Sequence, residues 1–169
     1  MILLLMRHGI AEELADAGDV DDAGRELTTG GRKKLREVAK YLRRAEMIPT
    51  LYLSSPRKRA IQTAKEVMKT CDGDERIVEL DSLDIGAVWR DFVNDVHLLA
   101  KKKKTDASIV LASGHMPSCG QFVTEALTGL PMGFEFKKGA VVALEWDGEI
   151  AESGARLLFY MTAKFARRN

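Results

Sequence analysis

The stretch Ile2-Leu3-Leu4-Leu5-Met6-Arg7-His8-Gly9 contains an apolar run that stops at an arginine and a histidine. The run is too short to span a membrane and predicts a buried β-strand. Further short apolar runs occur at residues 50–54, 77–80 and 108–112. Most segments between them have the periodicity of amphipathic helices, and this alternation predicts an α/β fold.

The spacing of apolar residues predicts helices at residues 31–45, 56–68, 87–103 and 117–127. Thr28 can cap the first of these helices. Residues 12–26 are acidic and aperiodic, which is typical of an exposed loop. Two strands are expected near the end, at residues 140–146 and 155–161. The length of 169 residues predicts a single domain over residues 1–169.

The composition is that of an ordinary globular protein, with 46% hydrophobic residues and 26 basic against 25 acidic side chains. The net charge of +1 predicts no general attraction to nucleic acid or to a membrane. No targeting signal is evident, so we expect a cytoplasmic protein, and nothing in the sequence requires more than a monomer. Cys71 and Cys119 form no Cys-x-x-Cys pair and are expected to be free thiols, with Cys119 in the core and no metal cluster.

Polar clusters directly follow three of the apolar runs: Arg7-His8-Gly9, residues 55–59 (SPRKR) and Gly114-His115. The carboxyl ends of parallel strands share one edge of a sheet, so these clusters are expected to meet there. Together they supply two histidines and several arginines, and predicted helix N-termini add N–H groups. Guanidinium groups suit phosphate oxygens, so the sequence predicts a phosphoryl site. A histidine there can be an electrostatic contact, a base or a nucleophile, and spacing does not decide between these roles.

Four stretches resemble the histidine phosphatase superfamily, namely residues 5–9 (LMRHG), 25–31 (RELTTGG), 54–64 (SSPRKRAIQTA) and 113–115 (SGH). The short length, the Arg-x-Leu-Thr-x-x-Gly pattern of the second stretch and the lack of an inserted cap domain make the chain most similar to the SixA branch, the phosphohistidine phosphatases. The resemblance implies a phosphoglycerate mutase-like fold, with three α/β/α layers around a central, mostly parallel sheet and no cap domain.

The resemblance also implies the roles of the site residues. His8 would be the nucleophile that becomes phosphohistidine, while Arg7 and Arg59 would bind the phosphoryl oxygens. His115 would donate to the transferring phosphoryl group. Arg59 is preferred to Arg57 because the family's functional arginine directly precedes alanine, and Arg57 is expected to be solvated or at the pocket rim. These cationic side chains make a metal ion or other cofactor unnecessary in the scheme.

A general acid that protonates the leaving oxygen is less well defined by the sequence. Glu79 is the candidate, with Asp81, Asp84 and Glu12 as alternatives. SixA-like members lack the usual acid. A phosphohistidine substrate tolerates that loss, because a protonated imidazole leaves more readily than an alkoxide.

Two further charged groups are interpreted as structural. Asp22 and Arg25 are expected to form an exposed salt bridge, with ordering of the loop beside the pocket as the alternative. The run from Lys101 to Lys104 lies at a predicted helix C-terminus and is expected to be solvated, with partner binding as the alternative.

The leading functional hypothesis is a metal-independent phosphohistidine phosphatase that dephosphorylates a signalling phosphoprotein through His8. One alternative is a phosphatase or phosphomutase for small phosphomonoesters, which would use the same intermediate. Another is an inactive phosphate-binding module. The expected partner is accordingly a phosphorylated protein or a small phosphorylated substrate.

Overall fold

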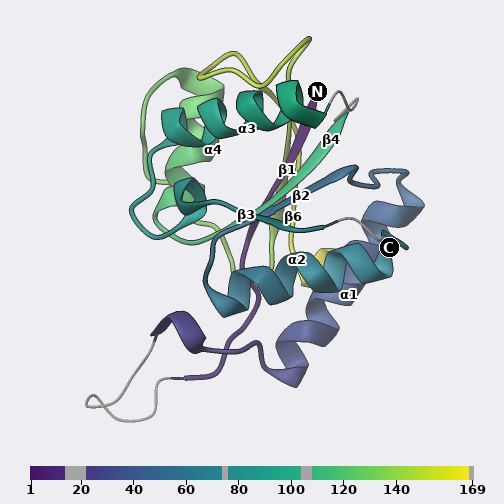
Figure 1. Cartoon of the computed structure of the whole chain (residues 1–169). Helices are drawn as coiled ribbons and strands as arrows, with labels where there is room; N and C mark the ends of the chain where they lie inside the picture. The colour runs from purple at the N-terminus through teal and green to yellow at the C-terminus, as the bar shows by residue number, and fades with distance from the viewer. Residues whose placement is uncertain (14–21, 74–75, 104–107, 168–169) are drawn as a thin grey trace.

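The computed structural model describes residues 1–13, 22–73, 76–103 and 108–167 and shows three α/β/α layers (Figure 1). The central sheet has six strands in the order β3-β2-β4-β1-β5-β6. Its strands are β1 (Ile2–Arg7), β2 (Leu51–Ser54), β3 (Val78–Glu79), β4 (Ile109–Gly114), β5 (Val141–Glu145) and β6 (Arg156–Met161). The strands from β3 to β1 pair in parallel, and β5 pairs antiparallel with both β1 and β6. The predicted α/β class, the mostly parallel sheet and the final strand pair are confirmed.

The helices lie on both sides of this sheet, with α3 and α4 on one side and α1 and α2 on the other (Figure 1). They are α1 (Thr29–Arg44), α2 (Lys58–Thr70), α3 (Trp89–Lys103), α4 (Ser118–Thr128) and α5 (Ala163–Ala166), with short 3-10 turns η1 (Asp22–Gly24) and η2 (Asp81–Leu83). All four predicted helices form, and their ends differ from the predicted ends by at most two residues. Thr28 caps α1 as expected, because its Oγ1 accepts a hydrogen bond of 2.9 Å from the Gly31 N–H.

The core consists of two apolar clusters, one on each face of the sheet. Leu3 and Leu5 of β1 belong to the cluster under α3 and α4, whereas Leu4 and Met6 belong to the cluster under α1 and α2. A strand with both faces covered has no solvated side, which explains the continuous apolar run of β1. The two cysteines are free and buried, and Cys119 lies in the core as predicted.

Some sequence expectations lie outside the described residues. Most of the predicted loop at residues 12–26 is among them, as are Lys104 and the side chains of Lys102 and Lys103. Among the helices of the described residues, none is long and apolar enough to cross a membrane. The same residues contain no inserted cap domain between the strands.

Candidate active site

The ends of β1 and β4 bring two histidines together. The strands run parallel with Arg7 opposite Gly114, and the backbone N–H of His8 donates to the Gly114 carbonyl at 3.0 Å. The next residue after each strand is a histidine, and the ring centroids of His8 and His115 lie 5.0 Å apart. Both side chains are buried, with 5% and 1% of their surface exposed. The clusters that the sequence places after these two strands therefore meet at one edge of the sheet.

His8 is held as a neutral imidazole. Its Nδ1 lies 2.7 Å from the carbonyl oxygen of Gly9, which can only accept, so Nδ1 carries the proton and Nε2 keeps its lone pair. Burial is the largest cause that lowers the pKa of His8 to about 3, and the charges of His115, Arg59 and Arg7 act in the same direction. An unprotonated ring nitrogen is what a histidine nucleophile requires at physiological pH.

Arg59 reaches His8 from the first turn of α2. Its side chain is 2% exposed, and its Nε donates to His8 Nε2 at 3.3 Å. Thr63, one turn further along α2, donates to the Arg59 carbonyl at 2.7 Å and accepts from the Gly9 N–H at 3.0 Å. Gly9 packs closely on α1, because a Cβ there would lie 2.8 Å from Leu35 Cδ1 and would require that side chain to shift. These contacts fix the start of α2 against the end of β1.

Two polar atoms of this cluster are buried without a hydrogen-bond partner among the described residues. They are Nε of Arg7 and Nδ1 of His115, whereas Arg7 Nη1 donates to the Phe136 carbonyl at 2.8 Å. The oxygen of the Ser55 hydroxyl lies 2.9 Å from His115 Nε2 and 3.3 Å from Asp84 Oδ1, and its single proton can be donated to either of them. When His115 accepts this proton at Nε2, it carries its own proton on Nδ1. Unpaired buried donors are costly, and an anion bound between them would satisfy them.

Asp22 lies at the centre of an arginine cluster. Its Oδ2 is 2.6 Å from Arg57 Nη1 and 3.0 Å from Arg59 Nη2, and its Oδ1 is 2.9 Å from Arg25 Nη2. The predicted salt bridge between Asp22 and Arg25 forms, but it is half-buried rather than exposed, and the carboxylate also joins two arginines of the second polar cluster. These contacts agree with the alternative, in which the two residues order the loop beside the pocket. Desolvation acts to raise the pKa of Asp22, but the hydrogen bond and charge of Arg59 and the other arginines outweigh it and lower this pKa.

A second carboxylate, that of Asp84, lies on the opposite side of Arg57. Arg57 Nε donates to Asp84 Oδ1 at 2.5 Å, and 23% of the Arg57 side chain is exposed, so Arg57 lies at the rim with both of its ends paired. Asp84 Oδ1 is 3.8 Å from His115 Nε2. Desolvation acts to raise the pKa of Asp84, but hydrogen bonds from Arg57 and from the Ile85 N–H lower it overall.

The candidate general acid Glu79 has no contact with this cluster. It is exposed on β3, the outer strand of the sheet, where it pairs in register with Ser54, and its carboxylate makes no hydrogen bond or ion pair with the described residues. The alternatives Asp81 and Glu12 are also exposed. Asp84 is the one of the four named carboxylates that the structure places beside a site histidine.

The relationship to known proteins follows from this geometry and from a sequence comparison. A model of the histidine phosphatase superfamily (branch 1) matches residues 3–87, which include His8, Arg7 and Arg59. The chain belongs to the histidine phosphatase superfamily. None of the curated protein sequences gives a match.

Solved structures of other phosphatases share the fold of this histidine phosphatase. The protein histidine phosphatase SixA complexed with tungstate is 25% identical, with a TM-score of 0.80 over 97% of this chain and 98% of its own. A structure described as a SixA phosphohistidine phosphatase from Agrobacterium tumefaciens is 22% identical, with a TM-score of 0.70 over 95% and 97%. A phosphoserine phosphatase mutant from Entamoeba histolytica, in complex with phosphoserine, is 14% identical, with a TM-score of 0.63 over 97% and 98%. The predicted superfamily and fold are confirmed.

The buried neutral histidines make the stability of this histidine phosphatase depend on pH. Burial lowers the pKa of His8 to about 3 and that of His115 to about 4, whereas an unfolded histidine titrates near ~6.5. The unfolded chain therefore binds more protons between these values, so this stability is present above about pH 6.5 and is lost as the pH falls toward about 4. We expect the free energy of unfolding, measured with urea, to fall by on the order of 1 kcal/mol per pH unit for each histidine in this window.

A His8→Asn variant removes the titration of His8 and leaves that of His115 and of the carboxylates of the site in place. Its free energy of unfolding should depend less steeply on pH than that of the wild type between about pH 6 and about pH 4.5. Parallel slopes for the two proteins would show that His8 is not buried in its neutral form.

Proposed function

We propose that this chain is a phosphohistidine phosphatase in which His8 is the nucleophile and Arg7, Arg59 and His115 bind the phosphoryl group. The observation that carries the proposal is the neutral, buried His8, whose Nε2 faces Arg59 and whose neighbours include unpaired buried nitrogens. The similarity to SixA structures supports the same substrate class.

In the first step the lone pair of His8 Nε2 attacks the phosphorus atom. The bond from phosphorus to the substrate nitrogen breaks, and the departing imidazole keeps that electron pair and a proton from the protonated substrate ring. Phosphoryl transfer spreads negative charge over the equatorial oxygens, which Arg7, Arg59 and, in the tautomer with its proton on Nδ1, His115 can stabilise. The phosphoryl group replaces Arg59 Nε as the partner of His8 Nε2.

In the second step water attacks the phosphorus atom of the His8 phosphohistidine. The bond to Nε2 breaks, inorganic phosphate leaves, and His8 returns to its neutral form with the proton still on Nδ1. The Gly9 carbonyl holds that proton throughout both steps, so the ring keeps one orientation. The low pKa of His8 favours release of the phosphoryl group, because a weakly basic nitrogen is a better leaving group.

The protonation of the acidic groups favours phosphohistidine over phosphomonoesters. A general acid must be protonated near neutral pH, which in proteins requires a raised pKa. The pKa values of Asp22 and Asp84 are instead lowered by their arginine partners, so both are ionised when substrate binds. An alkoxide leaving group would find no proton donor there, whereas the imidazole of phosphohistidine needs none.

Hydrolysis of several substrates in the presence of EDTA tests the proposal. We expect kcat/KM for free phosphohistidine and for a histidine-phosphorylated protein to exceed that for p-nitrophenyl phosphate or phosphoserine by about 100-fold or more. EDTA should not reduce the rate, because the cationic side chains supply the positive charge, and the described residues contain no group suited to hold a metal ion.

Each other outcome of this assay selects another function. Preference for monoesters would move the chain to the small-molecule phosphatases, and tight phosphate binding without hydrolysis would make it a binding module.

A Glu79→Gln variant should retain full activity, because this side chain is exposed and lies outside the site. Loss of activity in that variant would restore Glu79 as the general acid.

We further propose that a single domain over residues 1–169 acts as a cytoplasmic monomer on a phosphorylated protein.

A further inference from the structure

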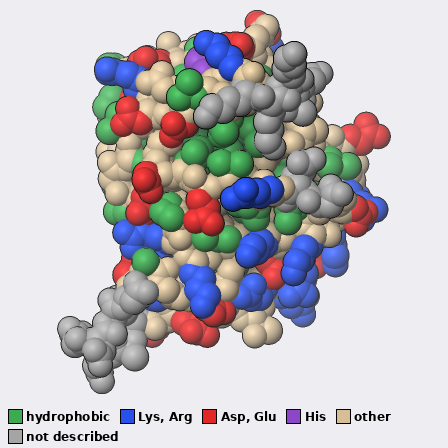
Figure 2. All heavy atoms as spheres, viewed as in Figure 1, with side chains coloured by type: hydrophobic (Ala, Val, Ile, Leu, Met, Phe, Trp, Pro, Cys, Tyr) green, Lys and Arg blue, Asp and Glu red, His purple; other side chains and the backbone are tan. Residues whose placement is uncertain are grey.

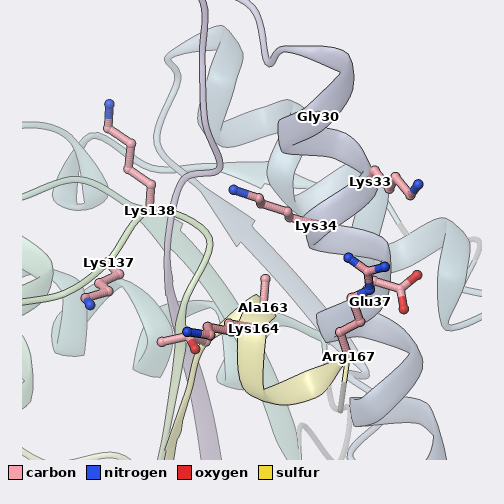
Figure 3. A pocket seen from close by; sticks show the side chains of 10 residues that line it. Gly30, Lys33, Lys34, Glu37, Lys137, Lys138, Ala163, Lys164 and Arg167 are labelled. Atoms are coloured by element: carbon pink, nitrogen blue, oxygen red, sulfur yellow. The ribbon is translucent and has the colours of Figure 1, made fainter. Parts of the chain in front are cut away.

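A basic surface hollow of about 880 Å³ lies between α1, α5 and the segment that precedes β5 (Figure 3). It is lined by the basic side chains of Lys33, Lys34, Lys137, Lys138, Lys164 and Arg167. In Figure 3 the Lys34 side chain extends from α1 into the hollow, and Lys137 and Lys138 stand on its other wall. The acidic side chain that lines the hollow, that of Glu37, is paired with Lys40 at 3.1 Å.

The six basic side chains of the basic hollow are exposed, and none of them forms an ion pair with a described residue. Of the other exposed cations, Arg36 pairs with Glu66, Lys58 with Glu26 and Arg43 with Asp72, whereas Lys65 and Lys69 of α2 form no ion pair with a described residue. On the face shown in Figure 2, acidic side chains likewise lie among the basic ones over α1 and α2. The chain as a whole carries a net charge of only +1, so the basic hollow is a local concentration of positive charge. Only Glu37 of its lining offsets this charge, through the electrostatic attraction of Lys33 and Arg167.

The basic hollow adjoins the candidate active site through both of its walls. On one wall, the Gly139 N–H donates to the carbonyl oxygens of Arg7 at 3.1 Å and His8 at 3.0 Å. On the other wall, the start of α1 is so close to the chain after His8 that a Cβ on Gly31 would lie 2.2 Å from the Ile10 carbonyl oxygen. Both walls of the basic hollow are therefore attached to the backbone on either side of His8.

We propose that the basic hollow binds an acidic face of the phosphoprotein substrate, next to its phosphohistidine. This inference rests on the proposed function and adds a specificity surface to it. A protein ligand fits better than nucleic acid or a membrane, because this concentration of positive charge is one hollow beside the site, while the rest of the chain has more acidic than basic side chains. Electrostatic complementarity of this kind increases the association rate and the selectivity for the partner.

The test uses two synthetic peptides, each phosphorylated on one histidine with phosphoramidate. They are identical except that one has a run of aspartate and glutamate beside the histidine where the other has asparagine and glutamine. For the wild-type chain at low ionic strength, we expect kcat/KM to be about 10-fold higher for the acidic peptide, chiefly through a lower KM, and added salt should reduce this preference. The Lys34→Glu/Lys138→Glu variant should lose the preference and keep its activity on free phosphohistidine within about twofold.

The matched control is Lys65→Glu/Lys69→Glu, which makes the same change of charge at two exposed positions of α2. This control should keep the wild-type preference for the acidic peptide. A preference that survives in Lys34→Glu/Lys138→Glu, or is absent from the wild type, would overturn the docking surface. Binding of duplex DNA or anionic vesicles that only Lys34→Glu/Lys138→Glu loses, without a peptide preference, would overturn it in favour of another polyanion. Failure of the wild type to hydrolyse free phosphohistidine would instead refute the proposed function.

Discussion

The His8→Ala variant should hydrolyse phosphohistidine at least about 1,000-fold more slowly than the wild type. The substitution removes the nitrogen that forms the covalent intermediate, and the structure places no other described nucleophile beside Arg59 Nε. Initial rates of phosphate release from free phosphohistidine measure the effect.

His97 provides the matched control for this substitution. His97 lies in α3 and is only half-buried, and its Nε2 is 2.6 Å from the Ile150 carbonyl oxygen, which is not part of the site. A His97→Ala variant should therefore retain its activity. Comparable rates for His8→Ala and the wild type would remove His8 from the mechanism, and an equal loss in both variants would indicate damage to the fold.

The Arg59→Ala variant should lose about 100-fold to 1,000-fold in kcat, because Arg59 is the buried cation nearest to the attacking nitrogen. Arg59→Lys should recover only part of this loss, since lysine keeps the charge but not the planar fork that follows the phosphoryl oxygens. Steady-state kinetics with free phosphohistidine measure kcat and KM separately.

Arg57 is the control for Arg59, because both arginines contact Asp22 but Arg57 lies at the rim. Arg57→Ala should reduce kcat by no more than about 10-fold. A larger loss for Arg57→Ala than for Arg59→Ala would exchange the roles of the two arginines.

The fold could be predicted from the sequence because its signals are strong and local. The apolar run of β1 is continuous because helices cover both faces of the sheet. The helices are predicted by the amphipathic spacing of their apolar residues and by a capping residue such as Thr28. The third strand is shorter than predicted, because only Val78–Glu79 of residues 77–80 form β3, although the Leu80 N–H still donates to the Ser54 carbonyl at 2.9 Å.

The meeting of His8, Arg59 and His115 was also predictable, because each of them follows a strand that ends at the same edge of a parallel sheet. The contacts of these residues with acidic side chains could not be predicted. Asp22 lies in a segment without periodicity, and its bonds to Arg57 and Arg59 join residues more than thirty positions apart. No local pattern encodes such a contact.

The choice between Glu79 and Asp84 depended on the path of the chain after β3. The 3-10 turn η2 carries the chain from the exposed end of β3 back toward the site, so that Asp84 reaches Arg57 and His115 while Glu79 stays at the outer edge. Apolar spacing gives no information on a turn of this kind. The basic hollow could not be predicted either, because the sequence has nearly equal numbers of basic and acidic residues and the lysines of the hollow come from three separate segments.

Transfer of the phosphoryl group to His8 Nε2 can be detected by trapping the phosphoenzyme. The chain is mixed with radiolabelled phosphohistidine, quenched in alkali within milliseconds, and digested for mass spectrometry under conditions that preserve phosphohistidine. We expect a label that is stable in alkali, labile in acid and confined to the peptide that contains His8. Rapid turnover without any labelled enzyme, or a label on another residue, would contradict this transfer.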